Sequence, residues 1–206
     1  SPSLYGGTYN LLHYTLPKMG IEVTFVDDPH DLAQWEAGIR DNTKVFFGEV
    51  LPNPKNDVFD LEGVSDVAHG HGIPLMVDNT MATPALCRPF EHGADIVVHS
   101  TTKFLNGHGN AIGGVIVDSG KFDWKAQADK FPSLTKPSGS YHGAVLVDAL
   151  EPVGPIAFII GCRVLGLRDL GPAMAPMNAF LALTGMETLH LRMDKHCTNA
   201  MALAEW

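Results

Sequence analysis

Two side chains that can carry out acid–base and carbonyl chemistry, Asp78 and Lys103, stand 25 positions apart in this sequence. Each follows a short apolar run, Ile73–Val77 before the carboxylate and Ile96–Val98 shortly before the lysine. Short apolar runs of this kind indicate buried strands. Because ligands of open α/β sheets lie beyond the carboxyl ends of the strands, we predict that both side chains face one ligand.

The pair Asp78 and Lys103 is typical of a pyridoxal-phosphate site. A lysine in a suitable environment forms a Schiff base with a carbonyl group. A carboxylate can keep a pyridinium nitrogen protonated, which makes pyridoxal phosphate an electron sink. Two alternatives remain open: a surface lysine at a strand end, and a carboxylate that caps a helix or a turn.

Three polar residues near the same predicted edge could complete such a site. Ser100 and Thr102 flank the lysine, and their hydroxyls could bind a phosphate together with backbone amides. They could equally bond to their own backbone. Asn53 follows a predicted strand and could donate to a phenolate oxygen of the cofactor, or it could be a turn asparagine beside Pro54.

Tyr5 is the remaining candidate, because it precedes Gly6 and Gly7. Two glycines permit a close approach of the backbone, and an aromatic ring beside them could stack on a flat cofactor. A buried core tyrosine is the alternative interpretation.

Other kinds of site lack their signatures. The ten histidines include no triplet with metal-ligand spacing, so we predict no metal site. No GxSxG nucleophile elbow occurs. The sequence Gly107-His108-Gly109 does not match GxGxxG and precedes a strand, which argues against a nucleotide-binding fingerprint.

The elements that must position these residues alternate between strands and helices. We predict strands over residues 22–26, 44–50, 73–77, 95–100 and 112–117, and helices over residues 9–18, 31–39, 60–71, 83–92, 155–170 and 177–206, with a long irregular stretch over 121–142. This alternation predicts an α/β fold: a three-layer arrangement with a mostly parallel sheet between helices.

The composition restricts the class of protein. The chain has 206 residues and a formal net charge of −9, which disfavours nucleic acid and anionic membranes as partners. No apolar run reaches the length of a membrane span. The three cysteines are widely spaced and odd in number, which favours a reducing, cytoplasmic location. We expect the sequence to be a segment of a longer polypeptide.

Several motifs together resemble one known family, the Cys/Met-metabolism family of pyridoxal-phosphate enzymes, of fold type I. They are LYGGTY, VDNT, RPFEHGADIVVHSTTKF and LHLRMDKHCTNA, and their order extends the resemblance over essentially the whole chain. The segments around RPFEHGADIVVHSTTKF, PSGSYHG and AFIIGCRVLGLRDLG are most similar to the O-acetylhomoserine sulfhydrylase branch.

The resemblance implies a role for each candidate residue. Lys103 matches the lysine that binds the cofactor covalently, and Asp78 matches the carboxylate paired with the pyridine nitrogen. Tyr5 matches the tyrosine that stacks on the ring and takes part in proton transfer. Ser100 and Thr102 match the phosphate-binding hydroxyls, and Asn53 matches the asparagine near the ring hydroxyl.

The resemblance also implies an activity and an organisation. The activity is γ-replacement on O-acetyl-L-homoserine, an amino-acid substrate, by sulfide or a thiol. Residues 1–190 would form the cofactor-binding large domain without its N-terminal segment, and residues 191–206 would begin the C-terminal domain. A homodimer or homotetramer with sites shared between subunits is expected.

Three competing functions stay open. The first is a cystathionine γ-synthase or γ-lyase of the same family, although γ-lyases that degrade methionine carry a cysteine where Gly7 stands. The second is an inactive, truncated domain that serves only in binding or assembly. The third, a nucleotide-binding α/β protein, lacks its sequence signatures.

Overall fold

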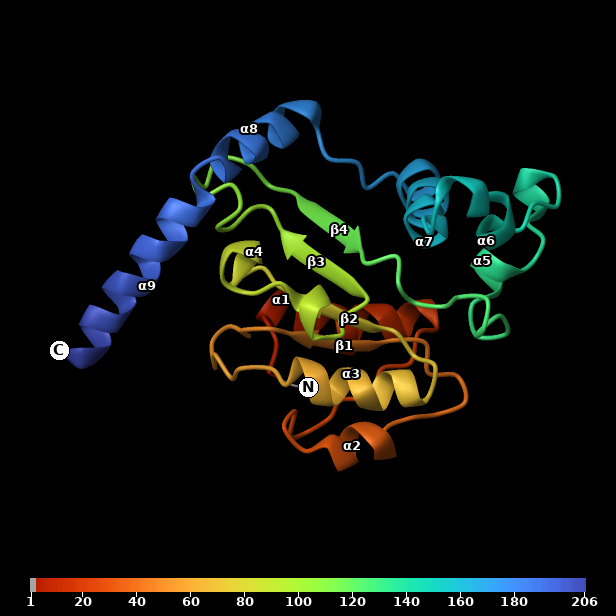
Figure 1. Ribbon diagram of the computed structural model, residues 1–206, viewed down its shortest axis with the longest axis horizontal. Helices are drawn as coiled ribbons and strands as arrows, with labels where there is room; N and C mark the ends of the chain where they lie inside the picture. The colour runs from red at the N-terminus through yellow and green to blue at the C-terminus, as the bar shows by residue number, and fades with distance from the viewer. Residues whose placement is uncertain (1–2) are drawn as a thin grey trace.

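A four-stranded sheet forms the centre of the protein, whose computed structural model describes residues 3–206 (Figure 1). The strands lie in the order β1-β2-β3-β4, and they are Phe46–Glu49, Leu75–Asp78, Ile96–Ser100 and Gly114–Asp118. β1, β2 and β3 are parallel, and β4 is antiparallel to β3. The predicted mostly parallel sheet is therefore confirmed.

The strand register brings the carboxyl ends of β1, β2 and β3 to one edge of the sheet. Glu49 pairs with Asp78, and Asp78 pairs with Val98, two residues before the end of β3. Ser100, which ends β3, pairs with Gly114 at the start of β4. Polar residues that are far apart in the sequence thus reach the same edge.

The sheet lies between two apolar layers because alternate side chains of a strand point to opposite faces. Leu75 and Val77 of β2 pack into one buried cluster, which also holds Trp35 of α2 (Leu32–Ala37) and Val64 of α3 (Leu61–Gly70). Ile96 of β3 faces the other cluster, formed with segments that follow β4. This arrangement confirms the three-layer prediction.

Helices α2 and α3 begin one residue after the starts of the predicted ranges 31–39 and 60–71, and an aspartate caps each of them. The Asp31 carboxylate accepts from the backbone N–H of Ala33 at 3.0 Å, and the Asp60 carboxylate accepts from that of Gly63 at 3.0 Å. Each cap satisfies a backbone donor that has no partner within the helix.

The remaining helices are mostly short. They are α1 (Gly6–Asn10), α4 (Thr83–Leu86), α5 (Pro132–Thr135), α6 (Leu146–Ala149), α7 (Ala157–Gly161), α8 (Pro176–Met186) and α9 (Leu189–Glu205). π-helical turns extend α1 and α7 over Leu11–Thr15 and Cys162–Leu170, and 3₁₀ turns occupy Leu16–Met19, Pro89–His92, Gly139–Tyr141 and Glu151–Val153. α5, α6 and α7 lie together, and α9 projects away from the sheet (Figure 1). Within residues 3–206, no helix is both long and apolar enough to cross a membrane.

Two predicted elements differ from the structure. Residues 22–26 form no strand, because they have no ladder partner among residues 3–206; together with residues 44–47 they line a cavity of about 470 Å³. The helix predicted over residues 83–92 is broken: α4 ends at Leu86, Cys87 is extended, and a 3₁₀ turn starts at Pro89. Proline cannot donate the backbone hydrogen bond that would continue the helix.

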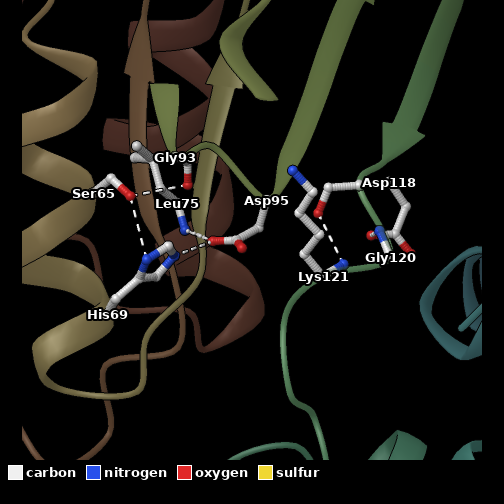
Figure 2. Close-up of polar contacts among 9 residues, drawn as sticks. Ser65, His69, Leu75, Gly93, Asp95, Asp118, Gly120 and Lys121 are labelled. Atoms are coloured by element: carbon white, nitrogen blue, oxygen red, sulfur yellow. Dashed lines mark hydrogen bonds and ion pairs between the residues drawn. The ribbon is translucent and has the colours of Figure 1, made fainter. Parts of the chain in front are cut away.

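A polar cluster joins α3 to the amino ends of β2 and β3 (Figure 2). This edge lies opposite the one that holds Asp78, because Asp78 ends β2. Asp95 Oδ2 lies 2.8 Å from His69 Nε2 and accepts from the backbone N–H of Leu75 at 2.9 Å. Ser65 Oγ lies 3.3 Å from His69 Nδ1 and donates to the carbonyl of Gly93 at 2.9 Å. This serine, histidine and aspartate set is structural, because Ser65 is only 2% exposed and its proton is used on Gly93.

Gly93, the glycine of this cluster, should tolerate replacement by alanine poorly. A Cβ at Gly93 would lie 2.3 Å from Ser65 Oγ, whereas one at Gly171 would meet nothing within 4 Å. Both glycines have a positive φ, +93° and +87°, so the backbone strain of an alanine is matched. We expect Gly93→Ala to lower the free energy of unfolding by about 1–3 kcal/mol more than Gly171→Ala, measured by urea denaturation. Equal losses in the two variants would contradict the crowding at Ser65.

Candidate active site

The carboxyl edge of the sheet continues into a tight turn that carries the candidate lysine. Ser100 ends β3, and its carbonyl accepts from the backbone N–H of Lys103 at 3.4 Å. The carbonyl of Lys103 in turn accepts from Gly107 at 2.8 Å. The side chain of Lys103 is exposed at this edge, so it is available to a ligand.

Tyr5 lies against this lysine although the two are nearly 100 positions apart in the sequence. Lys103 Nζ stands 5.9 Å from the centroid of the Tyr5 ring. The ring is 49% exposed, so the alternative of a core tyrosine is wrong. A Cβ at Gly7 would come within 2.7 Å of the ring, which explains why a glycine suits this position.

Asp78 and Ser100 are linked through Thr80. Asp78 Oδ1 accepts from the backbone N–H of Thr80 at 2.8 Å, and Thr80 Oγ1 accepts from the backbone N–H of Ser100 at 2.8 Å. The carboxylate therefore caps a turn, as its alternative interpretation predicts. That contact involves only Oδ1, so Oδ2 can still accept a hydrogen bond from a ligand.

The two candidate hydroxyls differ in their present partners. Thr102 Oγ1 accepts from the backbone N–H of Gly113 at 3.2 Å and donates to the Gly113 carbonyl at 3.4 Å. Within the described part of the chain, the Ser100 hydroxyl makes no such contact. The hydroxyl of Ser100 is therefore the better placed of the two to donate to a phosphate.

Glu49 is a site residue that the sequence analysis missed. It ends β1, is only 7% exposed, and accepts from the backbone N–H of Tyr5 with both oxygens, at 2.9 and 3.0 Å. Burial raises the pKa of Glu49, the Tyr5 N–H opposes that rise, and the nearby charge of Asp78 adds to it. The signal in the sequence is an acidic residue within the otherwise apolar run KVFFGEV.

These contacts connect the candidate residues to one another. Asn53, which begins a cis peptide bond to Pro54, is exposed just beyond β1, four residues after Glu49. The connected set runs from Glu49 through Tyr5 to Lys103, and from there through Ser100 and Thr80 to Asp78, with Thr102 beside the lysine. The six predicted residues therefore gather on one edge of the sheet, and their chemical roles stay predictions.

His99 lies buried close to the Asp78 carboxylate. It is 8% exposed, and its Nδ1 is buried without a hydrogen-bond partner in the described chain. Burial lowers the pKa of His99 below its usual 6.5, and the negative charge of Asp78 only partly opposes this effect. The imidazole is accordingly neutral near pH 7.

His99 should make the stability of the protein sensitive to mild acid. Because its folded-state pKa lies below the unfolded value of 6.5, the unfolded chain binds more protons in that window. Its stabilising contribution is present above pH 6.5 and is lost as the pH falls below it. We expect the free energy of unfolding to fall less steeply with acidification in His99→Gln than in the wild-type protein. The difference between the two slopes should correspond to up to about one bound proton. Denaturant titrations at several pH values measure this slope, and identical slopes in the two proteins would contradict it.

The residues at this edge fit pyridoxal phosphate, the cofactor that the family resemblance implies. An exposed amine stands beside an exposed aromatic ring, a carboxylate ends the adjacent strand, and a serine hydroxyl is available between them. The amine suits the aldehyde of the cofactor, and the aromatic ring suits its flat ring. The carboxylate suits its pyridine nitrogen, and the hydroxyl suits its phosphate. None of the six residues lines the cavity beside β1 or the cavity near His69.

Relatives of known name match the full chain. An O-acetyl-L-homoserine sulfhydrylase of Leptospira meyeri is 53% identical over 211 residues, which cover 100% of this chain and 47% of that protein. A homocysteine synthase of Schizosaccharomyces pombe is 52% identical over 206 residues, which cover 98% of this chain and 47% of that protein. The chain thus spans about half the length of the curated relatives that it matches.

A solved structure has the same fold as this chain. The crystal structure of a Campylobacter jejuni protein described as an O-acetylhomoserine (thiol)-lyase superposes with a TM-score of 0.91 at 40% identity. The match covers 98% of this chain and 49% of that protein, which carries a pyridoxyl-lysine monophosphate group. The sequence model of the Cys/Met-metabolism PLP-dependent enzymes matches residues 1–206, and this chain therefore belongs to that family.

Proposed function

We propose that this chain supplies the cofactor-binding edge of an enzyme that converts O-acetyl-L-homoserine and sulfide into homocysteine and acetate. The observation that carries the proposal is the approach of Lys103 Nζ to the Tyr5 ring, 5.9 Å from its centroid, on the edge that also holds Asp78. The names of the relatives support the choice of substrate. Methanethiol in place of sulfide would give methionine.

Each residue would have a distinct task in this reaction. Bound pyridoxal phosphate supplies an electron sink for negative charge at the substrate Cα. Lys103 would hold the cofactor through its amine, and the same amine, once released, can take the proton from Cα. Asp78 would accept a hydrogen bond from the ring nitrogen, which favours the protonated ring.

The other candidates would orient the cofactor and the substrate. Tyr5 would stack on the cofactor ring and could pass a proton at the substrate, and Asn53 would donate to the ring hydroxyl oxygen. Ser100 Oγ and Thr102 Oγ1 would donate to the phosphate. Thr102 must exchange its present contact with Gly113 to do so.

The chain's setting in a larger protein is also a proposal. Residues 1–190 would form the cofactor-binding domain and residues 191–206 the start of the next one, a boundary that falls inside α9. We propose a homodimer or homotetramer in the cytoplasm. All three cysteines, Cys87, Cys162 and Cys197, are free, as expected in a reducing compartment.

A comparison of nucleophiles tests the proposed function. The complete protein, loaded with pyridoxal phosphate, is given O-acetyl-L-homoserine with either sulfide or cysteine, and homocysteine and cystathionine are quantified. We expect homocysteine to form faster. Faster cystathionine formation would instead identify a cystathionine γ-synthase, and release of a keto acid without any added thiol would identify a γ-lyase. Glycine at position 7, where methionine-degrading γ-lyases carry cysteine, weighs against the last outcome.

A further inference from the structure

Glu49 connects separate segments of the chain at the carboxyl edge. It belongs to β1, and its carboxylate receives the backbone N–H of Tyr5, 44 residues away, on both oxygens at 2.9 and 3.0 Å. The side chain of Thr8, in α1, and the backbone of Asn53, in the loop after β1, lie close enough to lower the pKa of this carboxylate. All of these groups can donate, and a carboxylate is a side chain that only accepts.

The Tyr5 ring needs such an anchor because its own packing is slight. Tyr5 is 49% exposed and precedes the short helix α1, to which its carbonyl is joined by accepting from the backbone N–H of Tyr9 at 2.9 Å. Its position over Lys103 is therefore set largely by where the Tyr5 backbone is held. The contact that holds this backbone on the sheet is the charged hydrogen bond to Glu49.

The burial of the Glu49 carboxylate costs free energy of folding. A carboxylate that is only 7% exposed loses solvation, and its register partner is a second carboxylate, Asp78. An uncharged acceptor on β1 would avoid both costs. The donor that Glu49 receives on both oxygens belongs to Tyr5, a candidate cofactor contact.

We propose that Glu49 is a positioning residue, which holds Tyr5 in place at the cofactor edge without itself touching cofactor or substrate. The inference rests on the proposed function, since it assigns Glu49 a task at that same site. It adds the prediction that Glu49, which lies outside the motifs LYGGTY, VDNT, RPFEHGADIVVHSTTKF and LHLRMDKHCTNA, controls the orientation of the cofactor ring.

Variants at Glu49 and one matched control test the proposal in the complete protein. Glu49→Gln keeps the size of the side chain but removes the charge and leaves one acceptor oxygen for the Tyr5 N–H, whereas Glu49→Asp keeps the charge and both oxygens. The control is Asp57→Asn, because Asp57 Oδ2 accepts from Ser3 Oγ at 2.8 Å and so contacts the same N-terminal segment two residues from Tyr5.

Two readouts separate anchoring from general stability. Hydrogen exchange of the cofactor-free protein reports whether the Tyr5 amide is held. We expect Glu49→Gln to speed that exchange about tenfold, because a hydrogen bond to a charged carboxylate is replaced by a weaker one to a neutral amide oxygen. The induced circular dichroism of bound pyridoxal phosphate reports ring orientation. We expect this band to fall at least about twofold in Glu49→Gln, to recover partly in Glu49→Asp and to stay unchanged in Asp57→Asn.

Each outcome decides the proposal. Unchanged exchange at Tyr5 in Glu49→Gln shows that Glu49 is no anchor and overturns it. Faster exchange with an unchanged dichroic band shows a purely structural role and also overturns it, as does an equal loss in Asp57→Asn. If the wild-type protein gives no band with pyridoxal phosphate, the proposed function itself fails, and that result is recognised without any variant.

Discussion

Replacement of Lys103 by alanine is expected to lower the rate of homocysteine formation at least about a thousandfold. The variant loses the amine that stands 5.9 Å from the Tyr5 ring centroid, and with it both the covalent hold on the cofactor and the proton acceptor for Cα. The rate is measured with O-acetyl-L-homoserine and sulfide. Borohydride treatment followed by peptide mass spectrometry should place a pyridoxyl group on the peptide with Lys103 in the wild-type protein.

A second lysine provides the control for this prediction. Lys121 lies near Asp95 at the opposite edge of the sheet (Figure 2), so Lys121→Ala should leave the rate and the site of labelling unchanged. A Lys103→Ala protein with the wild-type rate, or borohydride labelling of another lysine, would rule out the assigned role of Lys103.

Replacement of Asp78 by asparagine should have the second largest effect. The amide oxygen can still accept from the backbone N–H of Thr80, as Oδ1 does at 2.8 Å, so the turn should persist. The amide nitrogen that replaces Oδ2 cannot accept from a protonated ring nitrogen. We expect kcat to fall about a hundredfold to a thousandfold, the range for loss of one preorganised electrostatic contact. Thermal unfolding should change little.

Asp95→Asn is the matched control, because Asp95 is a buried carboxylate at the other end of the same strands. Asp95 Oδ2 accepts from Leu75 and contacts His69, so this variant should lose stability while the folded fraction keeps its activity. If Asp78→Asn lost stability and kept its kcat, the carboxylate would be a structural cap and not a partner of the cofactor.

The sequence alone was sufficient for the elements whose signals are local. The apolar runs before Asp78 and Lys103 predict β2 and β3, and Asp31 and Asp60 mark the starts of α2 and α3. Alternation of strands and helices predicts the three-layer fold. These features depend on the periodicity of neighbouring residues and on hydrogen bonds within one turn, which a single stretch of sequence contains.

The tertiary structure decided whatever depends on partners distant in the chain. Residues 22–26 have the composition of a strand, but a strand needs a neighbour for its ladder, and these residues pair with none in the described chain. Glu49 has the sequence context of a core strand, and only the fold brings it to the backbone of Tyr5. Tyr5, Asp78 and Lys103 become one site because the parallel register of β1, β2 and β3 sets their carboxyl ends side by side. Strand register and contacts across 44 or more residues are properties of the whole packed chain, which is why local sequence patterns do not determine them.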